Sequence, residues 1–141
     1  MKYKIVVSKG VFSSVFDAAF GEKNVDWTLR FGGTECIECF LATDFKKVME
    51  SVKNDVVQIS DTEEFSFENE TSDVIIFIGN KTSAKFSKEY GISYQLPELP
   101  LGTAYLRGMK FLNKHIVFLS GCDDEGTRNA VMLYMERLGI N

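Results

Sequence analysis

The stretch "FLSGCDDEGTRNAVMLYMERLG", residues 118–139, contains the junction that decides the fold. It begins with an apolar strand that ends at Gly121, continues through three acids, and closes with apolar residues at helical spacing. Carboxylates at the start of a helix satisfy its free N–H groups and complement its dipole. The stretch therefore predicts a strand, a turn and a helix over 124–138.

Four residues have predicted structural roles in this turn and helix cap: Gly121, Asp123, Asp124 and Gly126. Gly121 permits the reversal of the chain, the two aspartates cap the helix, and Gly126 lets its first turn lie close to the neighbouring strand. A free helix start binds anions, but the acids at this one would repel a phosphate. We therefore interpret the junction as structural and not as a binding site.

The rest of the chain alternates between strand and helix patterns. Strands are predicted over 3–8, 25–31, 56–60 and 74–79, helices over 11–20, 34–52 and 83–90, and two strands joined at Leu112-Asn113-Lys114 within 103–121. Thr34 is the candidate N-cap of the long helix, residues 61–73 form a loop or an edge strand, and 95–102 is a connector. Residues 74–79 are apolar throughout, which is typical of a central strand covered on both faces.

This order predicts an α/β (α+β) fold. We expect a single two-layer domain over residues 1–141, with a mixed sheet of about five to six strands and helices packed on it.

Charge and composition restrict the kinds of partner. The 141 residues include 16 Lys and Arg and 20 Asp and Glu, for a net charge of −4. The basic residues are scattered among acids, whereas nucleic-acid-binding proteins gather them on one face. The apolar runs are far shorter than the roughly 20 residues of a membrane span, and the first residues lack a signal-peptide pattern. We expect a cytoplasmic domain with no nucleic-acid or membrane partner, although a piece of a secreted parent would have the same composition.

The cysteines do not predict a disulfide framework or a metal site. Cys36 and Cys39 form a C-x-x-C at a helix start, but the spacer lacks the Pro or Gly of redox motifs, so we interpret both thiols as core-facing and reduced. The remaining candidates for zinc, His115 and Cys122, would lie roughly 23 Å apart along a strand. The sequence predicts no metal and no cofactor, and a redox role for the C-x-x-C stays open.

Two further patterns are weak signals for chemistry. Residues 79–83, "GNKTS", look like the end of a phosphate loop but lack the first Gly of G-x-x-x-x-G-K-[ST], so we interpret them as a strand ending in a polar turn. Asp123 and Asp124 are adjacent and do not face each other as a catalytic pair must, and the sequence places no second acid opposite them. The sequence therefore predicts no catalytic residue.

The C-terminal stretch "PLGTAYLRGMKFLNKHIVFLSGCDDEGTRNAVMLYMERLGI", residues 100–140, resembles a known family. It is similar to the end of the small α/β domain that precedes the catalytic barrel in alpha-glucuronidases and beta-N-acetylhexosaminidases. The residues that carry the match are Gly102, Gly121, Asp123 or Asp124, Gly126, Ala130, Leu138 and Gly139. Residues 34–49 and 74–80 are similar to the first long helix and the central strand of that domain, so the resemblance covers about 34–139. It departs from the family at Arg128-Asn129, where Tyr-Gly is usual, and over 11–31.

The resemblance implies a non-catalytic accessory or scaffold domain of a carbohydrate-active enzyme. Its partners would be a catalytic barrel domain or carbohydrate, and the acids that act on the substrate would lie on the barrel. Two alternatives stay open. The strand, acid-rich turn, Thr-Arg and helix also resemble a surface-layer structural or assembly module, and the chain also fits a small ligand-binding domain or enzyme of unrecognised type.

Overall fold

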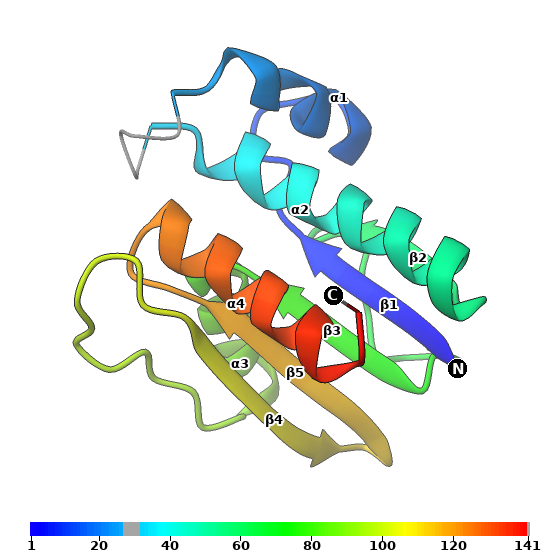
Figure 1. The fold of residues 1–141 in the computed structure, drawn as a ribbon. Coiled ribbons are helices and arrows are strands. Elements are labelled where there is room, and N and C mark those ends of the chain that lie inside the picture. Colours follow the sequence, from blue (N-terminus) through cyan, green and yellow to red (C-terminus); the bar gives the residue numbers. More distant parts are fainter. Residues whose placement is uncertain (27–31, 141) are drawn as a thin grey trace.

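The computed structural model describes residues 1–26 and 32–140, and its strands form one sheet. The sheet contains β1 (Lys2–Val7), β2 (Val56–Asp61), β3 (Val74–Ile78), β4 (Tyr105–Phe111) and β5 (Lys114–Ser120), in the order β2-β1-β3-β5-β4. The first four strands in that order are parallel, and β4 pairs with β5 antiparallel at one edge (Figure 1). The α/β class with a mixed sheet is confirmed.

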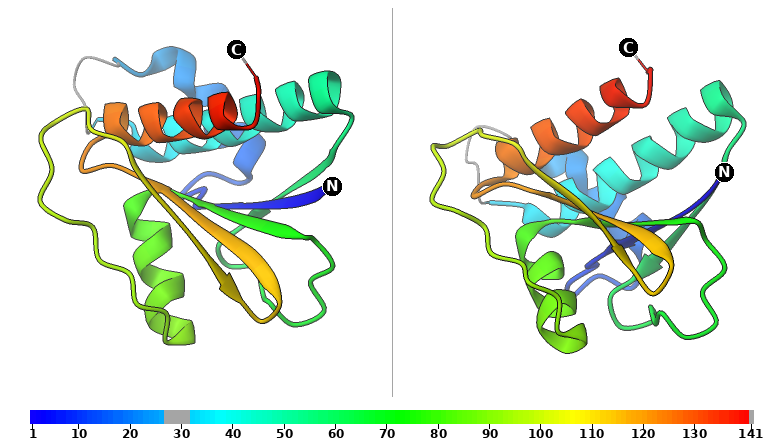
Figure 2. Two further views of the ribbon diagram at one scale, coloured as in Figure 1. Left: turned by 60° about the horizontal axis from the view of Figure 1, so that its bottom comes forward. Right: turned by 90° about the horizontal axis from the view of Figure 1, so that it is seen from below.

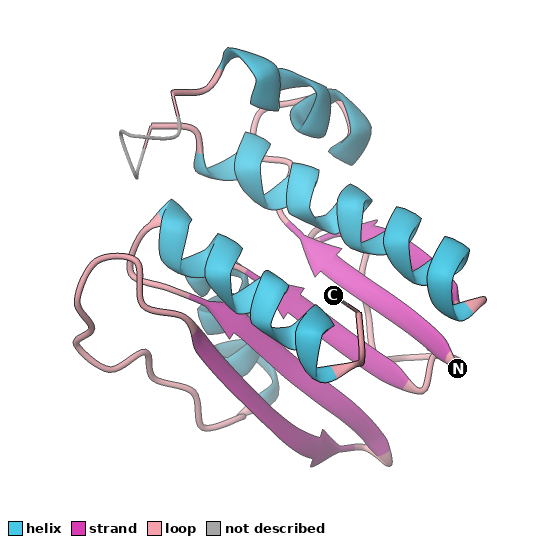
Figure 3. Ribbon diagram, in the orientation of Figure 1, coloured by secondary structure: helices cyan, strands magenta, loops and turns pink. Residues whose placement is uncertain are grey.

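Helices cover both faces of this sheet. On one face lie α2 (Thr34–Val48) and α4 (Asp124–Arg137), with α1 (Val15–Phe20) packed against α2 (Figure 3). On the opposite face lies α3 (Asn80–Tyr90), as the turned views show (Figure 2). A short 3₁₀-helix, η1 (Gly21–Asn24), follows α1, and a π-helical turn, η3 (Met49–Lys53), follows α2. The face with α3 therefore adds a layer to the two that were predicted.

Strand β3 lies at the centre of the sheet, as its uniform apolar sequence predicted, and it is buried along its whole length. Val74, Ile76 and Ile78 point into the core under α2 and α4. Ile75 and Phe77 point into a second, aromatic core that contains Phe86 of α3. Every side chain of this strand meets apolar neighbours because both faces of the sheet are covered.

The register aligns apolar side chains across the sheet. Ile5 of β1 is paired with Ile59 of β2 on one side and with Ile76 of β3 on the other, and Ile76 is paired with Val117 of β5. Ile5 and Ile76 belong to the core beneath α2 and α4, and the partly buried Ile59 and Val117 pack against it. A slip of one residue would move this row to the other face, so the row fixes the pairing.

Residues 62–73 form a loop, which decides between the two predicted alternatives. Since β2 and β3 are parallel and lie on either side of β1, the loop crosses the sheet on the face of α3. Phe65 and Phe67 anchor it, with exposed fractions of 8% and 7%. The ring centroid of Phe65 lies 5.9 Å from that of Phe77 and 5.4 Å from that of Phe86. These two aromatic residues hold an otherwise polar crossover against the second core.

The hairpin and the connector are confirmed, and several element boundaries differ. Leu112 and Asn113 have φ of 51° and 64°, the left-handed pair that a two-residue hairpin turn requires. Residues 95–102 contain no helix or strand. The helix predicted over 11–20 begins only at Val15, because the Ser14 side chain accepts a hydrogen bond from the Asp17 N–H and caps it there.

Two other boundary predictions are wrong, and a third concerns a segment that lies mostly outside the described residues. The N-cap of α2 is Gly33, so the prediction that Thr34 caps it is wrong. Helix α3 begins at Asn80, three residues before the predicted start. The strand predicted over 25–31 lies mostly outside the described residues, and Val25 and Asp26 are not in a strand.

We expect Phe65→Ala to lower the free energy of unfolding by about 3–5 kcal/mol, the usual cost of truncating a buried phenylalanine. The loss follows from the ring contacts with Phe77 and Phe86. Urea denaturation followed by circular dichroism measures it. Phe16→Ala is the matched control, since Phe16 is 65% exposed, and it should change stability by no more than about 0.5 kcal/mol. Equal effects of the two changes would show that the loop does not depend on Phe65.

Candidate functional site

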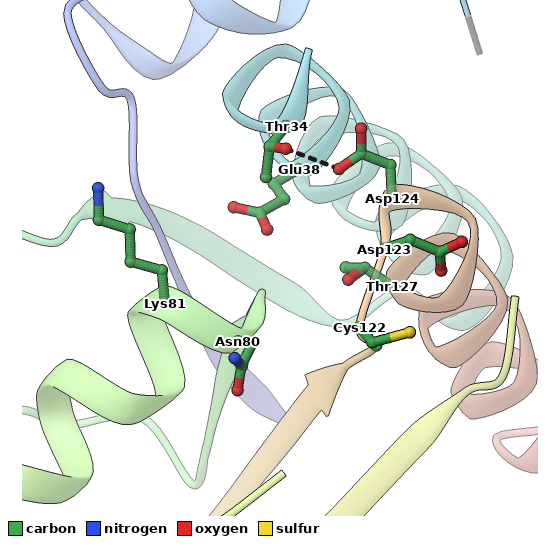
Figure 4. Close-up of a pocket in the computed structure, with 9 residues that line it drawn as sticks. Thr34, Glu38, Asn80, Lys81, Cys122, Asp123, Asp124 and Thr127 are labelled. Atoms are coloured by element: carbon green, nitrogen blue, oxygen red, sulfur yellow. Dashed lines mark hydrogen bonds between the residues drawn. The ribbon is translucent and has the colours of Figure 1, made fainter. Parts of the chain in front are cut away.

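The starts of three helices meet above the carboxyl ends of β3 and β5 and enclose a cavity, which we call the acidic pocket (Figure 4). Its volume is about 200 Å³. Its lining residues come from the starts of α2, α3 and α4 and from the turn that joins β5 to α4: Thr34, Glu38, Asn80, Lys81, Gly121, Cys122, Asp123, Asp124 and Thr127. The junction over residues 121–126, which was predicted to be only a structural turn, thus forms one wall of a pocket.

Glu38 of α2 is the most unusual residue of this pocket. It is only 5% exposed, and no hydrogen bond joins its side chain to another described residue. Burial, reinforced by the nearby carboxylates of Asp124 and Glu35, raises the pKa of Glu38 well above its usual range, and Lys81 opposes the shift. Its carboxyl group therefore tends to hold a proton that an exposed glutamate loses.

The Glu38 carboxyl group lies directly against the backbone at the end of β3. A Cβ atom added to Gly79 would lie 2.2 Å from Glu38 Oε2, closer than any real contact of that kind. Gly79 also has a φ of +98°, a conformation that side chains disfavour. Two features therefore require glycine at position 79: its backbone conformation, and the Glu38 carboxyl group, which leaves no room for a Cβ atom.

Asp124 contributes the second carboxyl group. Its Oδ1 accepts a hydrogen bond from Thr34 Oγ1 at 2.8 Å, whereas its buried Oδ2 has no hydrogen-bond partner among the described residues. Burial raises the pKa of Asp124, although hydrogen bonds from the Thr34 hydroxyl group and the Gly33 N–H oppose the shift. The sequence predicted that Asp124 caps α4, but the structure gives it a contact with α2 and leaves its Oδ2 without a hydrogen-bond partner.

Asp123 is the residue at the N-cap of α4. Its Oδ1 accepts a hydrogen bond from the Gly126 N–H at 2.8 Å. The Gly102 N–H approaches the same carboxylate, at 3.1 Å from Oδ1 and 3.2 Å from Oδ2. Asp123 thus joins the start of α4 to the connector that precedes β4, and its oxygens are occupied by the protein itself.

The two glycines of the junction lie against each other. A Cβ atom added to Gly121 would lie 2.5 Å from the carbonyl carbon of Gly126, and one added to Gly126 would lie 2.7 Å from the Thr103 carbonyl oxygen. Gly126 was predicted to lie close to a neighbouring strand, but its close approach is to Thr103, which precedes β4, and to Gly121. A side chain at either position would separate α4 from the end of β5.

Sequence reasoning missed Glu38, which it treated only as a spacer between two cysteines. The signal was its position on the helix, because Leu41 and Phe45 follow it at three and seven residues and both are buried. That spacing puts the carboxyl group on the apolar face of α2. A charged residue on such a face is uncommon unless it is paired, so the pattern marked it for attention.

The cysteines are free thiols, and Cys36 and Cys39 are buried. The Cys39 Sγ donates to the Ser8 carbonyl oxygen at 3.3 Å, and burial raises its pKa to about 12. Such a group is a poor nucleophile at neutral pH because it is not ionised. Their reduced state and the absence of a redox role remain predictions.

No metal centre is visible in residues 1–26 and 32–140, where no three His, Cys, Asp or Glu side chains are grouped to bind an ion. His115 is exposed near the start of β5, at the opposite end of the strand from Cys122.

The polar turn predicted for 79–83 is wrong, because Asn80 already belongs to α3. Gly79 is the N-cap of this helix, and Lys81, Thr82 and Lys85 line a second cavity of about 180 Å³. Ser8, Thr62 and Glu63 complete its lining. We call this cavity the basic pocket, and it adjoins the acidic pocket at Lys81, which lines both.

No family model, curated protein or solved structure matches this chain. Of the helices in the described part of the chain, none is both long and apolar enough to cross a membrane. The functional argument consequently depends on the geometry of the site.

We expect Asp123→Ala to lower the free energy of unfolding by about 0.5–2 kcal/mol, the usual cost of removing a helix cap. The change removes the acceptor for the N–H groups of Gly126 and Gly102. Urea denaturation measures the loss, and Asp123→Asn, which keeps an acceptor oxygen, should recover most of it. A neutral effect of Asp123→Ala would contradict the capping role.

The raised pKa of Glu38 gives the stability a pH dependence of known sign. The folded chain keeps this proton at pH values where the unfolded chain has lost it, so the group destabilises the fold as pH rises from about 4.3 towards its folded pKa. Glu38→Gln should remove this loss. The difference in unfolding free energy between the variant and the unchanged chain should then shift in favour of the variant by up to about 1.4 kcal/mol per pH unit in that window.

Urea denaturation from about pH 4 to pH 8 measures this difference over the range in which carboxyl groups with raised pKa values titrate. Glu136→Gln, at an exposed position of α4, is the control. A constant difference between Glu38→Gln and the unchanged chain across the series would mean that Glu38 is ionised in the folded state.

Proposed function

We propose that this domain binds a small polar ligand in the acidic pocket. The observation that carries the proposal is a pair of buried acids whose hydrogen-bonding capacity the fold does not fully use. Glu38 lines the pocket and is only 5% exposed, and the buried Oδ2 of Asp124 has no hydrogen-bond partner in the described structure. Leaving a buried polar atom without a partner costs roughly 1–3 kcal/mol, which a ligand that donates hydrogen bonds would recover.

The position of the pocket supports the same function. In open sheets of parallel strands, ligands bind beyond the carboxyl ends, where neighbouring strands send their connections to opposite faces. Here β3 leads into α3 on one face, and β5 leads into α4 on the other. The chain diverges between them and leaves the space that the acidic pocket occupies (Figure 4).

Size and chemistry define the class of ligand. A volume of about 200 Å³ is below the usual range of about 300–1,000 Å³ for drug-sized ligands, so the ligand is a small metabolite or the end of a longer molecule. The two carboxyl groups favour a ligand that carries several hydroxyl or amine groups as hydrogen-bond donors. Thr34 and Thr127 line the same space and add hydroxyl groups that both donate and accept.

A carbohydrate has the required donors, which is consistent with the accessory domain of a carbohydrate-active enzyme implied by the sequence resemblance. The structure does alter one premise of the non-catalytic interpretation, because Glu38 supplies the second acid that the sequence did not place opposite Asp124. We retain binding as the proposed role. A separate assay below distinguishes it from hydrolysis.

We expect glucosamine, which carries both an amine and hydroxyl groups, to bind the unchanged chain in calorimetric titration. Glu38→Gln and Asp124→Asn should each weaken binding about tenfold, because each replaces one carboxyl oxygen of the pocket by an NH2 group, which cannot accept a hydrogen bond. Glucose and glucuronate test whether hydroxyl groups suffice and whether an acid is tolerated. Glu136→Gln is the control and should bind as the unchanged chain does. Equal affinity in all four proteins, or no binding of any of the three sugars, would contradict the proposal.

Hydrolysis is tested with aryl glycosides and aryl glucuronides. Under the binding role, the chain releases no phenol. Turnover that Glu38→Gln or Asp124→Asn abolishes would instead identify the acidic pocket as an active site.

A further inference from the structure

The N–H groups in the first turn of α4 are capped by a side chain, whereas those in the first turn of α3 are not. Helix α4 starts on the Asp123 cap with Asp124 and Glu125 in its first turn. Helix α3 starts on Gly79, has no side-chain cap, and has no acid in its first turn. No hydrogen bond in the described part of the chain uses the N–H groups of Asn80, Lys81 or Thr82. An uncapped start of this kind favours an anion, through its N–H groups and the helix dipole.

A second, independent observation comes from Thr82. This residue is only 2% exposed, lines the basic pocket, and its Oγ1 has no hydrogen-bond partner in the described structure. A buried hydroxyl group without a partner is uncommon, since it loses water without regaining a hydrogen bond. It is available to donate to an acceptor atom in the pocket.

The charges around the basic pocket favour an anionic acceptor. Lys81 and Lys85 line it from α3, and Glu63 lines it from the crossover loop as an exposed side chain. Asp61, at the end of β2, does not compete for these lysines. Its carboxylate is 3.9 Å from Lys9 Nζ and accepts hydrogen bonds from the N–H groups of Lys9 and Glu63.

The pocket also lies where the sheet favours ligands. Ser8 follows the end of β1 and Thr62 follows the end of β2, while Lys81, Thr82 and Lys85 follow the end of β3. Neighbouring β1 and β3 send their connections to opposite faces, so this is a switch point of the sheet. Ser8 and Thr62 add two hydroxyl groups to the lining of the pocket.

We propose that the basic pocket is an oxyanion site, in which Lys81, Lys85, the Thr82 hydroxyl group and the free N–H groups of α3 bind a phosphate or carboxylate group. This inference goes beyond binding in the acidic pocket and does not depend on it. In this proposal, the stretch "GNKTS" forms the helix start that binds the anion. Gly79 replaces the glycine-rich loop of a phosphate-binding motif, because its left-handed φ turns the chain from β3 straight into the helix start.

The neighbouring acid is compatible with an anion here. Glu38 lies close to Gly79, but burial raises its pKa and so favours its neutral form. Lys81 stands between the two pockets. The anion thus meets two lysines, and the acids near it are the exposed Glu63 and Glu38, whose pKa is raised by burial.

The test is a titration of the ¹⁵N-labelled full chain with sodium phosphate at pH 7, with sodium chloride adjusted to hold ionic strength constant. Saturable amide shifts should concentrate at residues 80–83. The double change Lys81→Met and Lys85→Met should weaken binding by at least about tenfold, and Thr82→Val by a smaller factor, because charge-assisted hydrogen bonds are the stronger ones. Lys88→Met, an exposed lysine in the last turn of the same helix, is the matched control and should bind as the unchanged chain does.

Sodium acetate in place of phosphate distinguishes the two sources of the anion. Shifts at the same amides with acetate identify a site that accepts carboxylates, and shifts with phosphate alone identify a phosphate site. The inference is overturned if neither anion produces saturable shifts at residues 80–83, or if the double variant binds as well as the unchanged chain.

Since both lysines are exposed, the double variant should remain folded, and its circular dichroism spectrum checks this. Glu38→Gln and Asp124→Asn should retain these shifts, so failure here is distinguishable from failure of the acidic pocket.

Discussion

The burial of β3 on both faces is the constraint on which the rest of the structure depends. Its five residues have exposed fractions of 6% or less, so each face needs its own apolar layer. Helices α2 and α4 supply one layer, and α3 with the aromatic residues of the crossover loop supplies the other. Chain segments that leave adjacent strands must therefore separate to opposite faces, and this separation leaves the carboxyl edge of the sheet uncovered. The two pockets lie along that edge because the covering layers diverge there.

The helix starts that meet at this edge are completed in different ways. The side chain of Asp123 caps α4, and the same carboxylate also holds Gly102, so this start is closed by the protein itself. At α3 a glycine in a left-handed conformation precedes the helix, and no side chain caps it. A helix N-terminus that a side chain caps has a structural role. An uncapped N-terminus with lysines beside it has the chemistry of an anion-binding site. The contrast is that Asp123 closes the helix start in the acid-rich turn, whereas the shorter "GNKTS" leaves its helix start without a side-chain cap.

Sequence patterns predicted those elements whose cause is local. The two-residue hairpin turn, the central strand and the start of α4 follow from residues that are adjacent in the chain, and all three are present in the structure. The start of α3 was misplaced because Asn80 to Ser83 are polar and resemble a turn, while the helix is stabilised there by tertiary contacts. Ser83 Oγ bonds to the Gly79 carbonyl oxygen at 2.8 Å and lies 3.3 Å from Ser120 Oγ of β5. Glu38 was missed for the same kind of reason, since its importance comes from Asp124, which lies far from it in the sequence.

The cost of Glu38 supports a functional interpretation of its position. A leucine there would continue the apolar face formed with Leu41 and Phe45, and burying an ionisable group without a partner is unfavourable. A second cost lies beside it, because Gly79 holds a left-handed φ and leaves no room for a Cβ atom next to the carboxyl group. Local conflicts of this kind tend to coincide with functional sites, where an interaction with something outside the chain compensates for them. Lys81 lines both pockets. If the basic pocket binds an anion, as proposed, that anion would offset the positive charge that lowers the pKa of Glu38 and would favour the protonated acid, which donates a hydrogen bond as well as accepting one.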